Sequence, residues 1–267
     1  MASSAQEHYV IVDGHRIRYL EAGSGSPILM FHGLGLDASA DEWVHAMEPL
    51  SQDYRVIAVD RFGWGLSDRP ISGYSFPAWI SMVIGFMKEL GIPKAILMGH
   101  TLGGWICALV AHEHPELVEK LVLVNVAGLN VNAPVSPEGY QLPDKDGVGS
   151  MLERTYGTSD RVTEAMVNDH FDRITGPGVR DAYLAVLQYV NNPDVRKEWW
   201  LADRLPQVMT PTLVIWGAND TILTPEYGKQ AAALLPNGNL VLIDEGSHIP
   251  QVRQTEAFVS AVREFLG

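Results

Sequence analysis

Four short, uninterrupted apolar runs constrain the fold of this 267-residue chain more than any other feature of its sequence. They read PILMFHG, RVIAVD, KAILMGH and KLVLVNVAG, and they begin at residues 27, 55, 94 and 120. Strands that are buried on both faces have this pattern, and such strands belong to parallel sheets covered by helices. Helical patterns near residues 40–50, 77–90 and 102–114 separate the runs. The alternation therefore predicts a doubly wound, mostly parallel α/β sheet.

Both ends of the chain extend this sheet. Near the N-terminus, HYVIVDG and RIRYLEAG flank the turn dipeptide Asp13-Gly14, which predicts a β-hairpin. Near the C-terminus, TLVIWG and NLVLIDEGSH read as two more strands, followed by helices near 225–235 and 252–266. These segments complete one α/β core, which we expect to comprise residues 1–128 and 206–267.

One long insertion interrupts the sheet. Residues 129–150 are rich in Pro, Gly, Asn and Asp, and no strand pattern returns before TPTLVIWG at 210–217. The residues between show only helical patterns, near 150–156, 160–172, 178–191 and 194–203. We therefore predict an all-helical cap, residues 129–205, inserted after the sixth strand.

The third apolar run ends in a sharp turn. In ILMGHTLGG the spacing Gly99-x-Thr101-x-Gly103 is that of a nucleophile elbow, where a strand turns abruptly into a helix and exposes one side chain. The elbow normally carries serine, and here it carries threonine. A hydroxyl at this position is a candidate nucleophile, while the alternative is that Thr101 only caps the following helix.

Two further strand ends carry groups suited to activate a hydroxyl. Asp220 follows the strand TLVIWG, and His248 follows NLVLIDEGS. Taken alone, each has a plainer interpretation, as a turn aspartate or an exposed loop histidine. The carboxyl ends of parallel strands meet at one edge of a sheet, and Thr101, Asp220 and His248 follow in the order nucleophile, acid, base. The three are therefore candidates for a catalytic triad.

The end of the first parallel strand supplies candidate donors for an oxyanion. In FHGLGL, residues 31–36, glycines let the backbone pass close to a ligand and leave the N–H of Leu34 free. With the N–H of Leu102, the residue after the candidate nucleophile, it would form a two-donor oxyanion hole. We expect His32 to support this loop by hydrogen bonds rather than to react.

Five landmarks together resemble the α/β-hydrolase superfamily: HGLG, DRFGWGLSDRP, GHTLGG, WGANDTILTP and GSH. The resemblance is to its small capped members, which include esterases, lactonases and carbon–carbon hydrolases of meta-cleavage products. It implies Thr101, Asp220 and His248 as catalytic residues, Leu34 and Leu102 as oxyanion donors, and a helical lid. It also implies that Asp60 and Ser67 are structural. We expect the substrate to contact Gly33, His100, Trp199 and Ile249.

Threonine at the elbow leaves three functions open. A β-branched residue at positive φ is strained by about 1–3 kcal/mol, and its methyl group crowds the reacting centre. The chain is then a working hydrolase of medium-sized apolar esters or lactones, a hydrolase slowed by a serine-to-threonine change, or a non-hydrolytic lyase or ligand-binding member. A carbon–carbon hydrolase needs a clamp for an anionic substrate, for which Arg154, Arg173 and Arg180 are candidates.

Composition narrows the partners to a small-molecule substrate. The formal net charge of −13 argues against nucleic acid and anionic membranes. Cys107 is the only cysteine, so no disulfide forms within the chain, and we expect it to be buried. The scattered histidines have no metal-ligand spacing, and GHTLGG lacks the phosphate-binding turn of a nucleotide cofactor. We expect no metal or cofactor, and a cytoplasmic monomer or homodimer.

Overall fold

The computed structural model describes residues 5–130, 135–156 and 162–267. Its centre is an eight-stranded sheet with the strand order β1-β2-β4-β3-β5-β6-β7-β8. The strands are β1 (Gln6–Val12), β2 (His15–Ala22), β3 (Pro27–Phe31), β4 (Arg55–Val59), β5 (Ala95–His100), β6 (Val118–Val124), β7 (Thr212–Gly217) and β8 (Gly238–Ile243).

The sheet is parallel from β4 to β8 in the spatial order and antiparallel at its β1–β2 edge. Asp13 and Gly14 join β1 to β2 at φ 49° and 84°, a conformation that suits a two-residue hairpin turn. All residues of β5 and β7 are buried, as expected for strands covered on both faces. The predicted doubly wound, mostly parallel sheet is confirmed.

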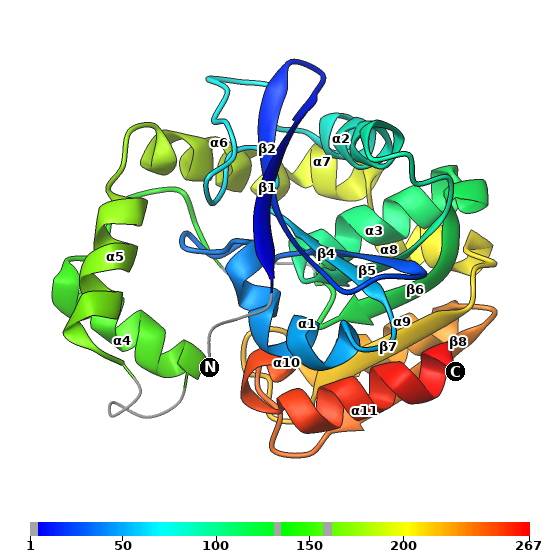
Figure 1. Ribbon diagram of the computed structural model, residues 1–267. Coiled ribbons are helices and arrows are strands. Elements are labelled where there is room, and N and C mark those ends of the chain that lie inside the picture. The colour runs from blue at the N-terminus through cyan, green and yellow to red at the C-terminus, as the bar shows by residue number, and fades with distance from the viewer. Residues whose placement is uncertain (1–4, 131–134, 157–161) are drawn as a thin grey trace.

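Helices cover both faces of the sheet (Figure 1). On one face α1 (Val44–Leu50) packs with α11 (Thr255–Leu266) around the buried rings of Trp43 and Phe258. On the other face lie α2 (Phe76–Glu89), α3 (Leu102–Glu113) and α9 (Pro225–Leu234). Cys107, on α3, is fully buried as predicted. Among the described residues, no helix is both long and apolar enough to cross a membrane.

The segment between β6 and β7, which the sequence predicts to be a cap, contains no strand in its described part, and its regular elements there are helices. They are α4 (Lys145–Tyr156), α5 (Glu164–Ile174), α6 (Val179–Asn191), α7 (Pro193–Glu198) and α8 (Leu201–Arg204). Figure 1 shows α4, α5 and α6 at one side of the molecule. Three helices differ from the predictions. α4 begins five residues earlier than 150, and α5 begins at Glu164 rather than near 160, where residues 160 and 161 lie outside the described part. The helix expected over 194–203 is broken into α7 and α8.

The loop after β4 has the structural role that was expected of Asp60 and Ser67. The buried Asp60 carboxylate accepts Arg18 Nη1 at 3.2 Å and the Leu66 N–H at 2.8 Å. Ser67 Oγ donates to the Asp60 carbonyl at 2.7 Å. A Cβ at Gly65 would lie 2.0 Å from Asp60 Oδ2, so only glycine fits where the chain turns around this carboxylate. The same loop contacts the candidate oxyanion segment, because Trp64 Nε1 donates to the Gly35 carbonyl at 2.8 Å.

Candidate active site

Thr101 has the backbone geometry of a nucleophile elbow. It stands between β5 and α3 at φ 42° and ψ −108°, a region that β-branched residues rarely enter. The turn is tight on both sides, because a Cβ at Gly103 would lie 2.3 Å from the Phe31 carbonyl oxygen and one at Gly99 would lie 2.4 Å from that of Gly103. The predicted elbow is confirmed as a conformation, with the strain that was expected for threonine.

Asp220 and His248 are hydrogen-bonded to each other. His248 Nδ1 lies 2.8 Å from Asp220 Oδ2, although the two residues follow different strands. The other carboxylate oxygen of Asp220 accepts the N–H groups of Ile222 at 2.8 Å and Leu223 at 3.0 Å. Burial works to raise the pKa of Asp220, but the hydrogen bond from His248 and its other partners outweigh it, so the pKa is lowered. Asp220 therefore remains a carboxylate.

The same contact shapes the protonation of His248. Burial lowers the pKa of the imidazole and outweighs the Asp220 carboxylate, which raises it. The net pKa lies below the ordinary value of histidine, so the ring is neutral at neutral pH. With its proton held on Nδ1 by Asp220, the ring has a free lone pair on Nε2, which is the form that a general base needs.

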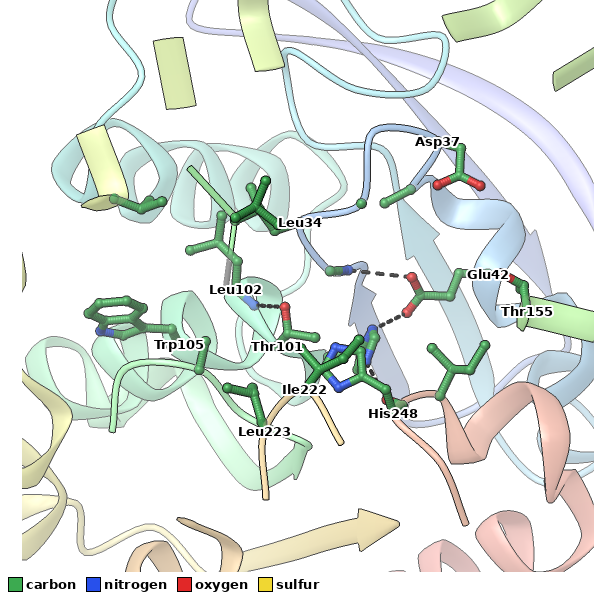
Figure 2. A pocket seen from close by; sticks show the side chains of 18 of the residues that line it. Leu34, Asp37, Glu42, Thr101, Leu102, Trp105, Thr155, Ile222, Leu223 and His248 are labelled. Carbon is green, nitrogen blue, oxygen red and sulfur yellow. Dashed lines mark hydrogen bonds and ion pairs between the residues drawn. The ribbon is translucent and has the colours of Figure 1, made fainter. Parts of the chain in front are cut away.

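Thr101 and His248 both line the cavity, and Figure 2 shows both among the side chains that surround it. The Thr101 hydroxyl accepts the Leu102 N–H at 2.5 Å, and among the described residues no hydrogen bond joins it to His248. Its methyl group faces Gly33, since a Cβ built there would lie 3.3 Å from Thr101 Cγ2. To be deprotonated by His248, the hydroxyl has to rotate away from Leu102.

The cavity has a volume of about 290 Å³, near the lower limit for small-molecule sites. In Figure 2, Leu34, Leu102 and Trp105 lie on one side of Thr101, and Asp37, Glu42 and Thr155 on the other. The cap closes it with Tyr183 of α6, among others. Its charged lining side chains are Asp37, Asp41, Glu42 and Arg196, with His100, His170 and His248 also present.

Three of the four expected substrate contacts, Gly33, His100 and Ile249, line the cavity. Trp199 is absent from its lining, so its position does not support a contact with substrate. Its ring packs 5.5 Å from the Phe76 ring, and its carbonyl accepts Trp105 Nε1 at 2.9 Å. Trp199 directly follows α7 as its C-cap residue, and at the break before α8 its contacts are with α2 and α3.

Glu42 is a largely enclosed member of the site, with a side chain that is 13% exposed, and sequence reasoning missed it. Its carboxylate lies 2.7 Å from His100 Nδ1 and accepts Gln251 Nε2 at 2.8 Å. His100 Nε2 donates to the His248 carbonyl at 2.8 Å, and the Glu42 carboxylate beside Nδ1 favours the imidazolium form of the ring. Burial opposes this charge, but Glu42 outweighs it and the pKa of His100 is raised. Glu42 had only a helical pattern in the sequence, without a signal for burial.

Asn125 is a second missed residue. It directly follows β6 at φ 42°, and its Nδ2 donates to Asp220 Oδ2 at 2.5 Å. The amide therefore helps to orient the carboxylate that holds His248. The signal was a polar residue at the end of the apolar run KLVLVNVAG, but that run was interpreted only as a strand.

Among the described residues, no three His, Cys, Asp or Glu side chains are grouped as metal ligands.

The sequence profile of the alpha/beta hydrolase fold matches residues 26–254. A 2-hydroxy-6-oxo-6-(2'-aminophenyl)hexa-2,4-dienoic acid hydrolase of Metapseudomonas resinovorans is 27% identical, over 99% of this chain and 92% of the relative. A meta-cleavage product hydrolase from Pseudomonas fluorescens IP01 is 26% identical, with a TM-score of 0.84 over 97% of both chains. The enol-lactonase from Burkholderia xenovorans LB400 is 23% identical, with a TM-score of 0.76 over 97% of this chain and 99% of its own, which shows the fold alone.

Proposed function

This chain belongs to the alpha/beta hydrolase fold family, and from that premise we propose that it hydrolyses a carboxylic ester or lactone through an acyl-enzyme on Thr101. The substrate is medium-sized, apolar and uncharged. The observation that carries the proposal is the Asp220–His248 pair, joined at 2.8 Å and lining one cavity with a hydroxyl on a strained elbow. A residue that only capped α3 would need neither the pair nor the cavity.

Each group has a defined step in this reaction. His248 Nε2 takes the proton of the Thr101 hydroxyl as its oxygen attacks the ester carbon, and Asp220 stabilises the imidazolium that forms. The N–H groups of Leu34 and Leu102 receive the oxyanion. Collapse of the tetrahedral intermediate expels the alcohol, which takes the proton from His248. Water, deprotonated by His248, then releases the acid and restores Thr101.

The charges around the cavity support an uncharged substrate. Three acidic side chains, Asp37, Asp41 and Glu42, line it against Arg196 and His100, and Glu42 is paired with His100. Arg196 donates to the carbonyls of Val190 and Asn130, so part of its hydrogen-bonding capacity is already used. An anionic substrate would lose its hydration and face more acidic than cationic side chains, which is unfavourable in a buried site.

A carbon–carbon hydrolase of the meta-cleavage type is the second candidate, because relatives that match nearly the whole chain bear that name. Two of the three arginines considered for its clamp are otherwise engaged. Arg173 pairs with Asp41 at 3.3 Å and with Asp169 at 2.5 Å, and Arg180 donates to the Tyr140 carbonyl at 3.4 Å. Neither lines the cavity, and the Arg154 side chain lies outside the described residues. These contacts favour the ester or lactone.

The test combines covalent labelling with turnover. A fluorophosphonate should add once to the protein, at Thr101, and should not label Thr101→Ala. Hydrolysis of p-nitrophenyl butyrate and of a simple lactone should be lost in both Thr101→Ala and His248→Ala. The second candidate is measured in parallel as the loss of dienolate absorbance. Turnover that survives in Thr101→Ala would exclude the acyl-enzyme, and ligand binding without turnover would favour a non-hydrolytic role.

A further inference from the structure

A fully buried arginine lies behind the candidate oxyanion loop without a carboxylate to pair with. Arg61 has no exposed surface, and among the described residues no acidic side chain lies within ion-pair distance of it. Its guanidinium lies 4.6 Å from the ring centre of Trp64 and 5.8 Å from that of Trp79. Burial lowers the pKa of Arg61, and Glu42 partly compensates from a distance. A buried cation in such surroundings is costly, so its contacts indicate what it does.

The shortest of these contacts is with the oxyanion loop. Arg61 Nη2 donates to the Gly33 carbonyl at 2.6 Å, a short bond that the positive charge strengthens. His32 approaches the same oxygen, with Nδ1 at 2.9 Å. Its Nε2 accepts the Arg61 backbone N–H at 3.2 Å, and burial keeps the pKa of the ring well below its ordinary value. The neutral ring therefore carries its proton on Nδ1 and donates it to Gly33.

Two donors thus hold the Gly33 carbonyl. Because the peptide group is planar, the orientation of this carbonyl also sets the direction of the Leu34 N–H. The described chain contains no cis peptide bond, so the Leu34 N–H points away from the Gly33 oxygen. That oxygen is turned toward Arg61, behind the loop, while Gly33 and Leu34 line the cavity with Thr101. The N–H is thereby aimed at the cavity. The positive charge of Arg61 beside the carbonyl oxygen also polarises the Gly33–Leu34 peptide and makes the Leu34 N–H a stronger donor.

We infer that Arg61 is a positioning residue for the hydrolytic reaction: with His32 it fixes the Gly33–Leu34 peptide so that the Leu34 N–H faces the oxyanion. This inference rests on the proposed function for its catalytic consequence. The orientation of the peptide itself does not depend on the reaction, so it is tested separately. Arg61 does not touch the substrate and acts only through the backbone of Gly33.

The first test is kinetic and uses Arg61→Met, which keeps a long side chain but removes the donor and the charge. Misdirecting one oxyanion donor should lower kcat for p-nitrophenyl butyrate by about 10²-fold with KM nearly unchanged, since a donor of this kind contributes about 10²–10³-fold. Affinity for a boronic acid that mimics the tetrahedral intermediate should fall in parallel. Arg61→Lys keeps a charged donor and should recover part of kcat.

The control is Val262→Ala, a fully buried position on α11 in the core of the opposite face. It lowers stability without a contact to the loop, so kcat and boronic acid affinity of the folded protein should remain those of the starting chain. If Arg61→Met behaves like this control, with a lower melting temperature only, then Arg61 is merely structural and the inference is wrong.

The second test does not need turnover. A crystal structure of Arg61→Met should show the Gly33 carbonyl rotated, with the Leu34 N–H no longer directed at residue 101. A carbonyl that keeps its orientation would overturn the inference even if kcat falls. A rotated carbonyl in a protein that hydrolyses no ester would refute the proposed function and leave the positioning role of Arg61 established.

Discussion

The threonine at position 101 sets the reactivity of the site at the scale of a single residue. Its φ of 42° is strained for a β-branched side chain, and its methyl group faces Gly33, beside the candidate oxyanion peptide. Thr101→Ser removes that methyl group and leaves the hydroxyl. We expect kcat for p-nitrophenyl butyrate to rise about tenfold, which corresponds to about 1.4 kcal/mol of the barrier.

The measurement for Thr101→Ser is a steady-state comparison of both proteins on the same ester, with thermal unfolding recorded alongside. Because serine is less strained at this φ, the melting temperature should not fall. Thr101→Val serves as the matched control, since it keeps the branched shape without the hydroxyl and should be inactive. A serine variant that is slower than threonine would show that the cavity is shaped around the methyl group.

The imidazolium of His100 acts on the neighbouring base through its charge. The two rings lie 5.0 Å apart, and the positive charge of His100 lowers the pKa of His248. Only neutral His248 accepts a proton, so kcat/KM should fall at acidic pH with a midpoint below the ordinary histidine value of about 6.5. His100→Gln removes the opposing charge and leaves Glu42 negative, so the midpoint should move to higher pH.

The pH profile of kcat/KM for an uncharged ester checks this prediction in both proteins. His114→Gln, a histidine near the end of α3 outside the cavity, is the control and should leave the midpoint where it is. A midpoint that moved to lower pH in His100→Gln would contradict the electrostatic argument. A flat profile in the unaltered protein would contradict the assignment of His248 as the base.

At the scale of elements, the site residues that could be predicted from the sequence are those that directly follow a strand. Thr101, Asp220 and His248 each follow an apolar run, and parallel topology brings such positions to one edge without knowledge of any contact. Neither Glu42 nor Arg61 had a comparable signal in the sequence for a place in the site. Glu42 belongs to a segment with only a helical pattern, and Arg61 belongs to a loop that was interpreted as structural. Their importance arises from contacts between elements distant in sequence, which periodicity does not encode.

Local sequence also failed to predict two helix boundaries in the segment between β6 and β7. The start of α4 was hidden by Gly147 and Gly149, although the Asp144 carboxylate accepts the Gly147 N–H at 2.9 Å and caps the helix. The break between α7 and α8 follows from tertiary packing, since the Trp199 carbonyl accepts the Trp105 indole of α3. Local sequence favours a helix there, and the contact overrides it.

One arginine ties the cap elements together. Arg196 of α7 donates to the Val190 carbonyl of α6 at 3.0 Å and to the Asn130 carbonyl, which follows β6, and its guanidinium lies 5.5 Å from the Trp105 ring. Arg196→Met leaves these carbonyls without their charged donor, at a cost of about 1.5–3 kcal/mol. We expect faster limited proteolysis within the cap and a several-fold rise in KM, with a smaller effect on kcat.

Arg180→Met is the control for Arg196→Met, because Arg180 is exposed and makes one carbonyl contact within the cap. It should leave both the proteolysis rate and KM unchanged. Equal effects of the two substitutions would show that loss of cationic charge, rather than loss of the tie between α6, α7 and the end of the core, is responsible.

At the scale of the whole molecule, the negative net charge of the chain and the carboxylates of the cavity both disfavour an anionic substrate. The chain carries a formal charge of −13, and the cavity adds carboxylates at its wall. Such a field lowers the local concentration of anions, and salt weakens it over a Debye length of about 10 Å at 0.1 M. The p-nitrophenyl monoester of succinic acid should therefore react at least tenfold more slowly, in kcat/KM, than p-nitrophenyl butyrate, and its rate should rise with added salt.

The rate of butyrate hydrolysis should hardly change over the same salt series, which makes it the internal control. An anionic ester that reacts faster, and slows as salt is added, would mean that a cationic clamp operates in the site. That result would favour the carbon–carbon hydrolase over the ester or lactone hydrolase.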